Sequence, residues 1–213
     1  MPAAELVSCP NCKSPVKKGS ALCPICSAPM EGAPKPNLLE PPPPLPPRPP
    51  VEARRLPPMK DSSTYLVKEA QPGEAYVLFK SGLIGGRKGM CVTRIFPQKV
   101  REQYQMSELP IIWLSNIGKE DSVRPKDLEK LSLLLEQFFV KEGGLVLLDG
   151  IEYLITNNNF LTVLRLVQSL RDQVALNKAT LLLSVNPSTL DSHQLNLLER
   201  EVDGVIDLTA PAD

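Results

Sequence analysis

Proline sets the first limit on this chain, because twelve of its 23 prolines lie between Pro34 and Pro58, many of them in the run PPPPLPPRPP. Proline fixes φ and lacks the amide hydrogen that helices and sheets require. We therefore expect residues 33–60 to be a proline-rich disordered linker of polyproline II character, about 3.1 Å long per residue. The linker divides the 213 residues into a small module, residues 1–32, and a domain, residues 61–213.

The same linker contains PxxP repeats near Arg48, which is the pattern of an SH3-type ligand. Any long proline run contains PxxP, so this alternative is weakly specified. A spacer that holds the small module away from the domain is the favoured interpretation.

The small module contains two CxxC pairs, Cys9 with Cys12 and Cys23 with Cys26, separated by ten residues. A two-residue gap lets both thiolates of a pair face one ion, and two such knuckles complete a closed tetrahedral shell. We expect these four cysteines to hold one structural Zn²⁺. So short a module cannot bury a sufficient core, and metal binding would supply most of its folding free energy.

Two redox-active CxxC pairs are the alternative, but that motif sits at a strand–helix junction and none is predicted here. The module resembles the short zinc ribbons of many prokaryotic proteins, which often read CPxCG, with Lys13 and Ser27 in place of the glycines. Zinc ribbons frequently bind nucleic acid. This one has no aromatic residue and no arginine, so it offers neither a stacking platform nor a strong phosphate-binding patch. A protein contact or a purely structural role is favoured.

The net charge of zero is unevenly distributed. Residues 1–60 carry eight Lys and Arg against four Asp and Glu, so residues 61–213 carry sixteen against twenty. This mild acidity argues against a broad nucleic-acid footprint on the domain. No run approaches the roughly 18 apolar residues of a membrane span, and the N-terminus lacks the pattern of a secretory signal. We expect a cytoplasmic protein with no membrane association and with reduced cysteines.

From residue 62 onward, short apolar runs alternate with amphipathic segments. Strands are predicted at residues 64–67, 89–94, 110–115, 145–148, 179–185 and 205–208. Helices are predicted at residues 75–83, 97–104, 125–141, after 159, and at 191–200. Several strands are apolar on both faces, which predicts an α/β fold with a doubly wound, mainly parallel sheet between helices.

Ligands of such sheets bind beyond the carboxyl ends of the strands. The polar residues expected there are Lys68, Glu69, Thr93, Arg94, Ser115, Asn116, Asp149, Glu152 and Asn186. Asp149 has the position of a Walker B aspartate, which holds magnesium through water. The accompanying phosphate loop should read GxxxxGK(S/T), yet residues 68–76 read KEAQPGEAY. We expect one glycine to be too few for a nest of N–H groups, and Glu69 and Glu74 to repel a triphosphate.

Other catalytic signals are weak. Residues 85–89, GGRKG, precede a strand and are expected to form a helix-to-strand turn rather than a phosphate cradle. His193 is the only histidine and is expected to be exposed at the start of a helix. Cys91 lies inside a strand, where a buried and inert thiol is expected. We therefore assign no catalytic and no cofactor-binding residue, and expect no enzyme.

The domain also resembles a known family through the runs TYLVKE, KGMCVTRIFPQKVRE, PIIWLS, DLEKLSLLLEQFF, GGLVLLDGIEYLITNNNF and VLRLVQSLRDQVAL. They resemble an uncharacterised archaeal family, domain of unknown function 835 (DUF835), over residues 62 to about 208. The order of elements resembles a RecA/KaiC-type ATPase core, with residues 68–76 at the phosphate loop and Asp149 at the Walker B acid. The resemblance implies a degenerate RecA-like domain in regulatory or scaffolding work, because family members are sometimes joined to signalling modules such as sensor kinases.

Three functional hypotheses follow. The leading one is a non-catalytic regulatory or scaffolding protein of signal transduction, in which the zinc ribbon and the degenerate domain bind a protein partner. The second is a nucleotide-binding enzyme with Asp149 on magnesium and Arg94 or Arg87 on phosphate. The third is a nucleic-acid binder that uses the ribbon and the basic linker residues Arg48, Arg54, Arg55 and Lys60. The oligomeric state is not indicated by any of these patterns.

Overall fold

The structure is a computed structural model that describes residues 6–9, 13–17, 59–118 and 122–209. The chain divides into two units, residues 1–52 and 53–213, and each is described by itself. In the first unit the described residues form an antiparallel hairpin of β1 (Leu6–Ser8) and β2 (Pro15–Lys17).

The second unit contains a sheet of seven described strands, and each pairs with its neighbours in parallel. They are β3 (Ser63–Lys68), β4 (Gly89–Thr93), β5 (Ile111–Leu114), β6 (Ser122–Val123), β7 (Leu145–Asp149), β8 (Thr180–Val185) and β9 (Gly204–Asp207). Their order across the sheet is β6-β5-β4-β7-β8-β3-β9. Because β3 and β7 flank β8, two segments far apart in the sequence reach the same edge of the sheet.

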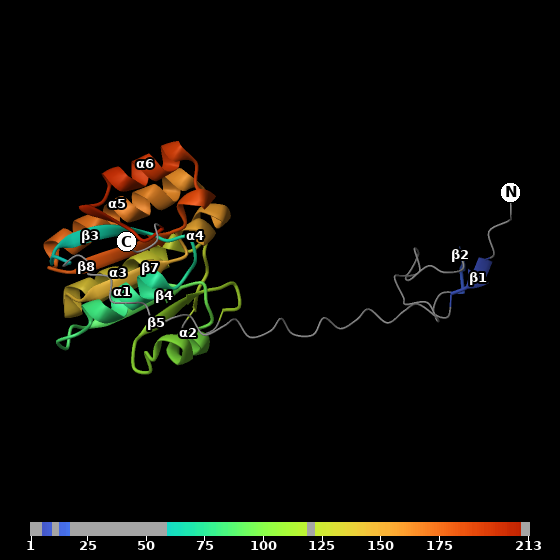
Figure 1. Ribbon diagram of the computed structural model, residues 1–213, viewed down its shortest axis with the longest axis horizontal. Helices are drawn as coiled ribbons and strands as arrows, with labels where there is room; N and C mark the ends of the chain where they lie inside the picture. Colours follow the sequence, from blue (N-terminus) through green and yellow to red (C-terminus); the bar gives the residue numbers. More distant parts are fainter. Residues whose placement is uncertain (1–5, 10–12, 18–58, 119–121, 210–213) are drawn as a thin grey trace. The chain divides into compact units, whose positions relative to one another are not determined.

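Helices cover both faces of this sheet, as Figure 1 shows. One face carries α1 (Glu74–Gly82) and α2 (Pro97–Tyr104). The other carries α3 (Leu128–Glu142), α4 (Ile151–Asn157), α5 (Phe160–Leu176) and α6 (Ser192–Arg200). A short 3₁₀ turn, Pro187–Thr189, links β8 to α6.

The central strands are apolar because both of their faces are buried. In β7, Leu145 and Leu147 pack into the core beneath α1 and α2, whereas Val146 and Leu148 pack against the helices of the opposite face. All four side chains are fully buried. Side chains alternate across a strand, so a strand between two helical layers reads as a continuous apolar run. The predicted α/β fold with a parallel sheet is confirmed.

One helix boundary was predicted wrongly, and two elements were not predicted at all. Helix α3 begins at Leu128 and not at residue 125, because the Asp127 carboxylate accepts the N–H of Lys130 at 3.1 Å and caps the helix there. Strand β6 was not predicted, since two residues are too few for a periodic signal. Helix α4 was also missed: Gly150, with φ of 121°, turns the chain straight from β7 into a helix of seven residues.

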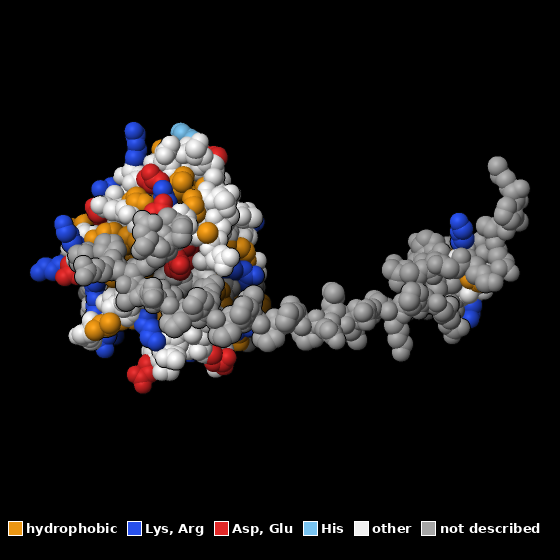
Figure 2. Space-filling model, viewed as in Figure 1, with side chains coloured by type: hydrophobic (Ala, Val, Ile, Leu, Met, Phe, Trp, Pro, Cys, Tyr) orange, Lys and Arg blue, Asp and Glu red, His pale blue; other side chains and the backbone are white. Residues whose placement is uncertain are grey.

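No helix in the described parts of the chain combines the length and the apolar character needed to cross a bilayer. On the face of the domain visible in Figure 2, hydrophobic side chains form small groups between charged ones.

Candidate functional site

The connections between strands place a crevice at the carboxyl edge of the sheet. Strand β4 leads to α2 on one face, while its neighbour β7 leads to α4 on the other. Strands β3 and β8 diverge in the same way, toward α1 and α6. Such switch points are where open α/β sheets bind their ligands. The candidate site is therefore the edge formed by the carboxyl ends of β4, β7, β8 and β3.

Glu69 follows β3 directly, and its side chain is buried at the start of α1, with 3% of the residue exposed. Its Oε2 accepts the backbone N–H groups of Gly73, Glu74 and Ala75 at 3.1, 2.9 and 3.1 Å. Its Oε1 accepts the hydroxyl of Ser184 at 2.5 Å. The unpaired N–H groups and the dipole of a helix N-terminus favour an anion, and here the chain's own carboxylate is that anion.

This arrangement corrects one expectation. A single glycine was expected to be too few for a nest of N–H groups. In the structure, three backbone N–H groups converge around one carboxylate oxygen. Gly73, with φ of 139°, supplies the unusual backbone conformation, and the first turn of α1 supplies the remaining donors. Glu69 does not merely repel anions near this nest, because it fills the nest.

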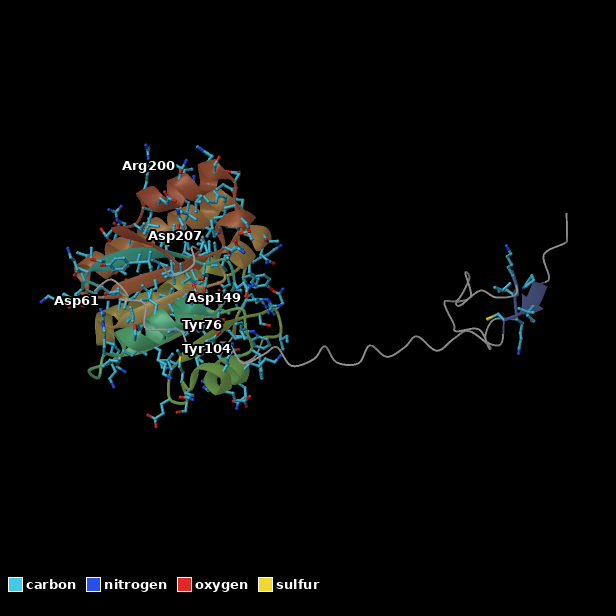
Figure 3. All side chains as sticks on the ribbon, in the orientation of Figure 1. Asp61, Tyr76, Tyr104, Asp149, Arg200 and Asp207 are labelled. Carbon is cyan, nitrogen blue, oxygen red and sulfur yellow. The ribbon has the colours of Figure 1, made fainter. Side chains whose placement is uncertain are left out.

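Asp149, at the end of β7, is held by two hydroxyl groups. Its Oδ2 accepts the Tyr76 hydroxyl at 2.5 Å and the Thr93 hydroxyl at 3.2 Å. The ring of Tyr76 stacks on that of Tyr104, with centroids 4.4 Å apart and planes 5° apart. Figure 3 labels Asp149, Tyr76 and Tyr104, which lie close together at this part of the domain. The aspartate is thus fixed by α1, by β4 and, through the stacked ring, by α2.

The surroundings of Asp149 also change its acidity. Burial raises the pKa of this carboxyl from its ordinary value of 3.8 to about 6, against the lowering effect of the hydrogen bond from Tyr76. The nearby carboxylates of Glu69 and Glu152 raise the pKa further. Burial also raises the pKa of the Tyr76 phenol, and the charge of Asp149 adds to that rise. Mild acidification therefore protonates Asp149.

Apart from Asn116, the other expected polar residues at this edge contact local protein groups. Lys68 pairs with Glu199 at 2.5 Å. The Arg94 guanidinium lies 4.5 Å from the centre of the Tyr153 ring and donates to the Leu114 carbonyl at 3.2 Å. The remaining contacts are Asn186 N–H to Glu152 Oε1 at 2.7 Å and Ile117 N–H to Ser115 Oγ at 3.2 Å. Asn116 is exposed.

Arg87 does not belong to this site. It precedes β4, so it lies at the amino edge of the sheet, and it donates to Asp61 at 2.8 Å and to Thr180 at 2.6 Å. The hypothesis that Arg87 contacts a phosphate near Asp149 is therefore wrong. Gly85 and Gly86 form the expected turn between α1 and β4, with φ of 95° and 85°.

The predicted environments of His193 and Cys91 are confirmed. His193 is exposed near the start of α6. Cys91 is fully buried in β4, and burial, together with the charge of Asp149, raises the pKa of its thiol. A raised thiol pKa disfavours the reactive thiolate.

Sequence reasoning missed Tyr76 and Ser184, which join Asp149 and Glu69 at the edge. Tyr76 was placed inside the helix predicted at residues 75–83, and nothing in the sequence there marks its hydroxyl as functional. Ser184 did carry a signal, because it is the one polar residue in the apolar run 181–185. A buried hydroxyl in such a run requires a hydrogen-bond partner.

Among the described residues, no three His, Cys, Asp or Glu side chains lie close enough together to hold a metal ion. Of the four predicted zinc ligands, Cys9 is buried and directly follows β1. Its N–H donates to the Ser14 carbonyl at 2.9 Å, and its own carbonyl accepts from Lys13 at 3.0 Å. Cys12, Cys23 and Cys26 lie outside the described residues.

Comparison with known proteins identifies one family. No curated protein matches the chain. A family model described as "Protein of unknown function (DUF835)" matches residues 68–202, which run from the last residue of β3 past the end of α6. That range contains Glu69, Asp149 and Ser184 and is more than half of the chain. The chain therefore belongs to the DUF835 family, whose function is unknown.

Proposed function

We propose that this protein is a non-catalytic regulatory or scaffolding protein, in which a zinc ribbon and a degenerate RecA-like domain bind a protein partner. The observation that carries the proposal is the position of Glu69. Its carboxylate accepts the N–H groups at the N-terminus of α1, which is where a RecA-like ATPase would bind phosphate.

The strand order supports the RecA-like part of this proposal. Strand β3 leads into residues 68–76, and β7 ends in Asp149, with β8 alone between them. A phosphate loop and a Walker B aspartate need this proximity, because both act on the same nucleotide and its magnesium. The phosphate loop also needs a lysine, and the first lysine after Lys68 is Lys80, near the far end of α1.

A nucleotide would have to displace Glu69 before its phosphates could reach α1. The displaced carboxylate would lose three N–H donors and the hydroxyl of Ser184, and hydrogen bonds to charged groups are each worth roughly 1.5–3 kcal/mol. It would then lie beside a polyphosphate of the same sign. Asp149 would in addition have to exchange its two hydroxyl partners for magnesium and water.

The hairpin of β1 and β2 supports the zinc-ribbon part. Cys9, the first residue of a CxxC pair, is buried directly after β1, and its N–H donates to the Ser14 carbonyl next to β2. The two-residue gap of such a pair lets both thiolates face one ion. Cys9, Cys12, Cys23 and Cys26 would hold the ion, whose closed shell leaves no position for catalysis. We assign the ribbon to contact with a protein partner, and the family resemblance suggests signal transduction as the setting.

Calorimetric titration of the full-length chain with ATP and with GTP, each with magnesium, tests the central claim. We expect no binding by the wild type. Micromolar affinity that disappears in Asp149→Ala would overturn the proposal and favour the nucleotide-binding alternative. Glu74→Gln is the control for Asp149→Ala, because it removes a carboxylate from the first turn of α1 and leaves Asp149 and the Glu69 nest in place.

The nucleic-acid alternative is tested separately by fluorescence anisotropy with a labelled RNA and a labelled DNA over a salt series. Binding through the basic linker would weaken steeply as salt rises. We expect no binding even at low ionic strength, and a steep salt dependence would favour the alternative.

A further inference from the structure

The domain contains a second hollow that is remote from Glu69 and Asp149. It has a volume of about 760 Å³ and lies at the amino edge of the sheet. Its walls are the last turns of α3, residues 105–110 between α2 and β5, and the turn that enters β4. Small-molecule sites in proteins have volumes of about 300–1,000 Å³, so this hollow has room for a whole ligand.

The floor of the hollow is apolar. Helix α3 contributes Leu134 and Phe138, which are four residues apart and therefore on one face. Leu83, Met90 and Leu109 complete the apolar lining from the other walls. Such a surface favours an apolar body that displaces water from it.

The rim of the hollow is basic. Two of its cations are already paired, Arg87 with Asp61 at 2.8 Å and Lys141 with Glu142 at 3.5 Å. Lys80 and Lys88 are exposed at the same rim, and among the described residues neither has an ion-pair partner. Glu108 is the remaining acid of the lining. Two available ammonium groups beside an apolar floor favour a ligand with an anionic end.

We propose that this hollow binds an amphipathic anion, a small molecule with an apolar body and a carboxylate or phosphate head. The apolar body lies against Leu134 and Phe138, and the head pairs with Lys80 and Lys88. The site does not depend on the function proposed above, because it lies at the opposite edge of the sheet and shares no residue with the Glu69 nest or with Asp149.

Calorimetric titration of the full-length chain tests this proposal. The probes are laurate and dodecyl phosphate, which share a tail and differ in the head, and dodecyltrimethylammonium, which has the same tail and the opposite charge. All are used below their micellar concentrations. We expect one-to-one binding of at least one anion, and affinity for the cation weaker by about tenfold or more.

Three variants locate the binding. The double variant Lys80→Gln, Lys88→Gln is expected to weaken anion binding by about tenfold, since it removes both charged partners of the head. Gln137→Trp places an indole in the hollow from an exposed position of α3 and is expected to abolish binding. Lys99→Gln, an exposed lysine on α2 outside the lining, is the control and is expected to bind as the wild type does.

Unchanged circular dichroism and an unchanged unfolding midpoint show that each variant is folded. Preference for laurate or for dodecyl phosphate identifies the head group and supports the site. The proposal is overturned if neither anion binds, if the cation binds equally well, or if the double variant binds like Lys99→Gln.

Discussion

Glu69 accepts the hydroxyl of Ser184 at 2.5 Å, across the boundary between the carboxyl ends of β3 and β8. The other oxygen of the same carboxylate caps α1. One buried side chain thus joins two neighbouring strands and a helix at the edge where ligands of this fold class bind. Its loss should affect the stability of the whole edge.

Glu69→Ala should lower the free energy of unfolding of the domain by about 3 kcal/mol. Loss of a helix cap costs about 1 kcal/mol, and the buried hydroxyl of Ser184 loses its partner at a cost of about 1–3 kcal/mol. Glu69→Gln keeps an oxygen acceptor and should lose less. Urea unfolding measures these differences, with Glu74→Gln as the control expected within about 0.5 kcal/mol of the wild type. Equal losses in Glu69→Ala and Glu74→Gln would contradict the structural role of Glu69.

Asp149→Asn should change how the stability of the domain depends on pH. The folded protein keeps a proton on Asp149 up to about pH 6, whereas the unfolded chain releases it near the ordinary value of 3.8. The resulting stabilisation is complete below pH 3.8 and is lost as pH rises through about 6. The variant lacks this loss, so its stability relative to the wild type should increase by on the order of 3 kcal/mol between pH 4 and pH 7.

Urea unfolding midpoints of the wild type and of Asp149→Asn, measured in parallel from pH 4 to pH 8, check this prediction. The other carboxyl groups titrate in both proteins, so the difference between the two curves isolates Asp149. Parallel curves would show that the pKa of this carboxyl is not raised in the folded state.

The layers of the fold were predictable because burial on both faces leaves a direct trace in the sequence. The run 145–148 is apolar without interruption, and the structure buries all of it. Asp149 was predictable as well, since a polar residue that ends such a strand must lie at the sheet edge. The partners of these residues were not predictable, because the strand order that brings β3, β8 and β7 together is a tertiary property.

The role of Glu69 shows this limit most clearly. The sequence shows that Glu69 is charged, and this charge indicated repulsion of phosphate. The sequence does not show where the carboxylate of Glu69 points. The direction depends on Gly73, whose positive φ turns the N–H groups of α1 back onto the carboxylate. Whether residues four apart meet across a turn depends on the backbone conformation of that turn, which the sequence alone does not specify.

Cys23→Ser should release the zinc that we assign to the small module. Structural zinc contributes on the order of 10 kcal/mol or more to the folding of such a module, so loss of one ligand should unfold it. Metal analysis is expected to find one zinc per chain in the wild type and less in the variant, while the unfolding transition of the domain stays unchanged. Cys91→Ser is the matched control: it alters a cysteine buried in β4 and should leave the zinc content at one. Zinc loss in both variants, or in neither, would contradict the four-cysteine assignment.

Tyr76→Phe should show what the hydroxyl of Tyr76 contributes independently of its ring. The ring and its stacking on Tyr104 remain, but Asp149 loses the hydrogen bond that lowers its pKa. The domain should lose about 1–2 kcal/mol of stability at pH 8, where Asp149 is ionised, and less at pH 4, where it is protonated. Tyr65→Phe is the control. Its hydroxyl accepts an exposed N–H from Lys60 at 3.0 Å, the one hydrogen bond it makes within the described parts of the chain, so its removal should cost at most about 0.5 kcal/mol. Urea unfolding at the two pH values measures both variants, and an equal loss for Tyr76→Phe at pH 4 and pH 8 would mean that its hydroxyl does not stabilise the ionised carboxylate.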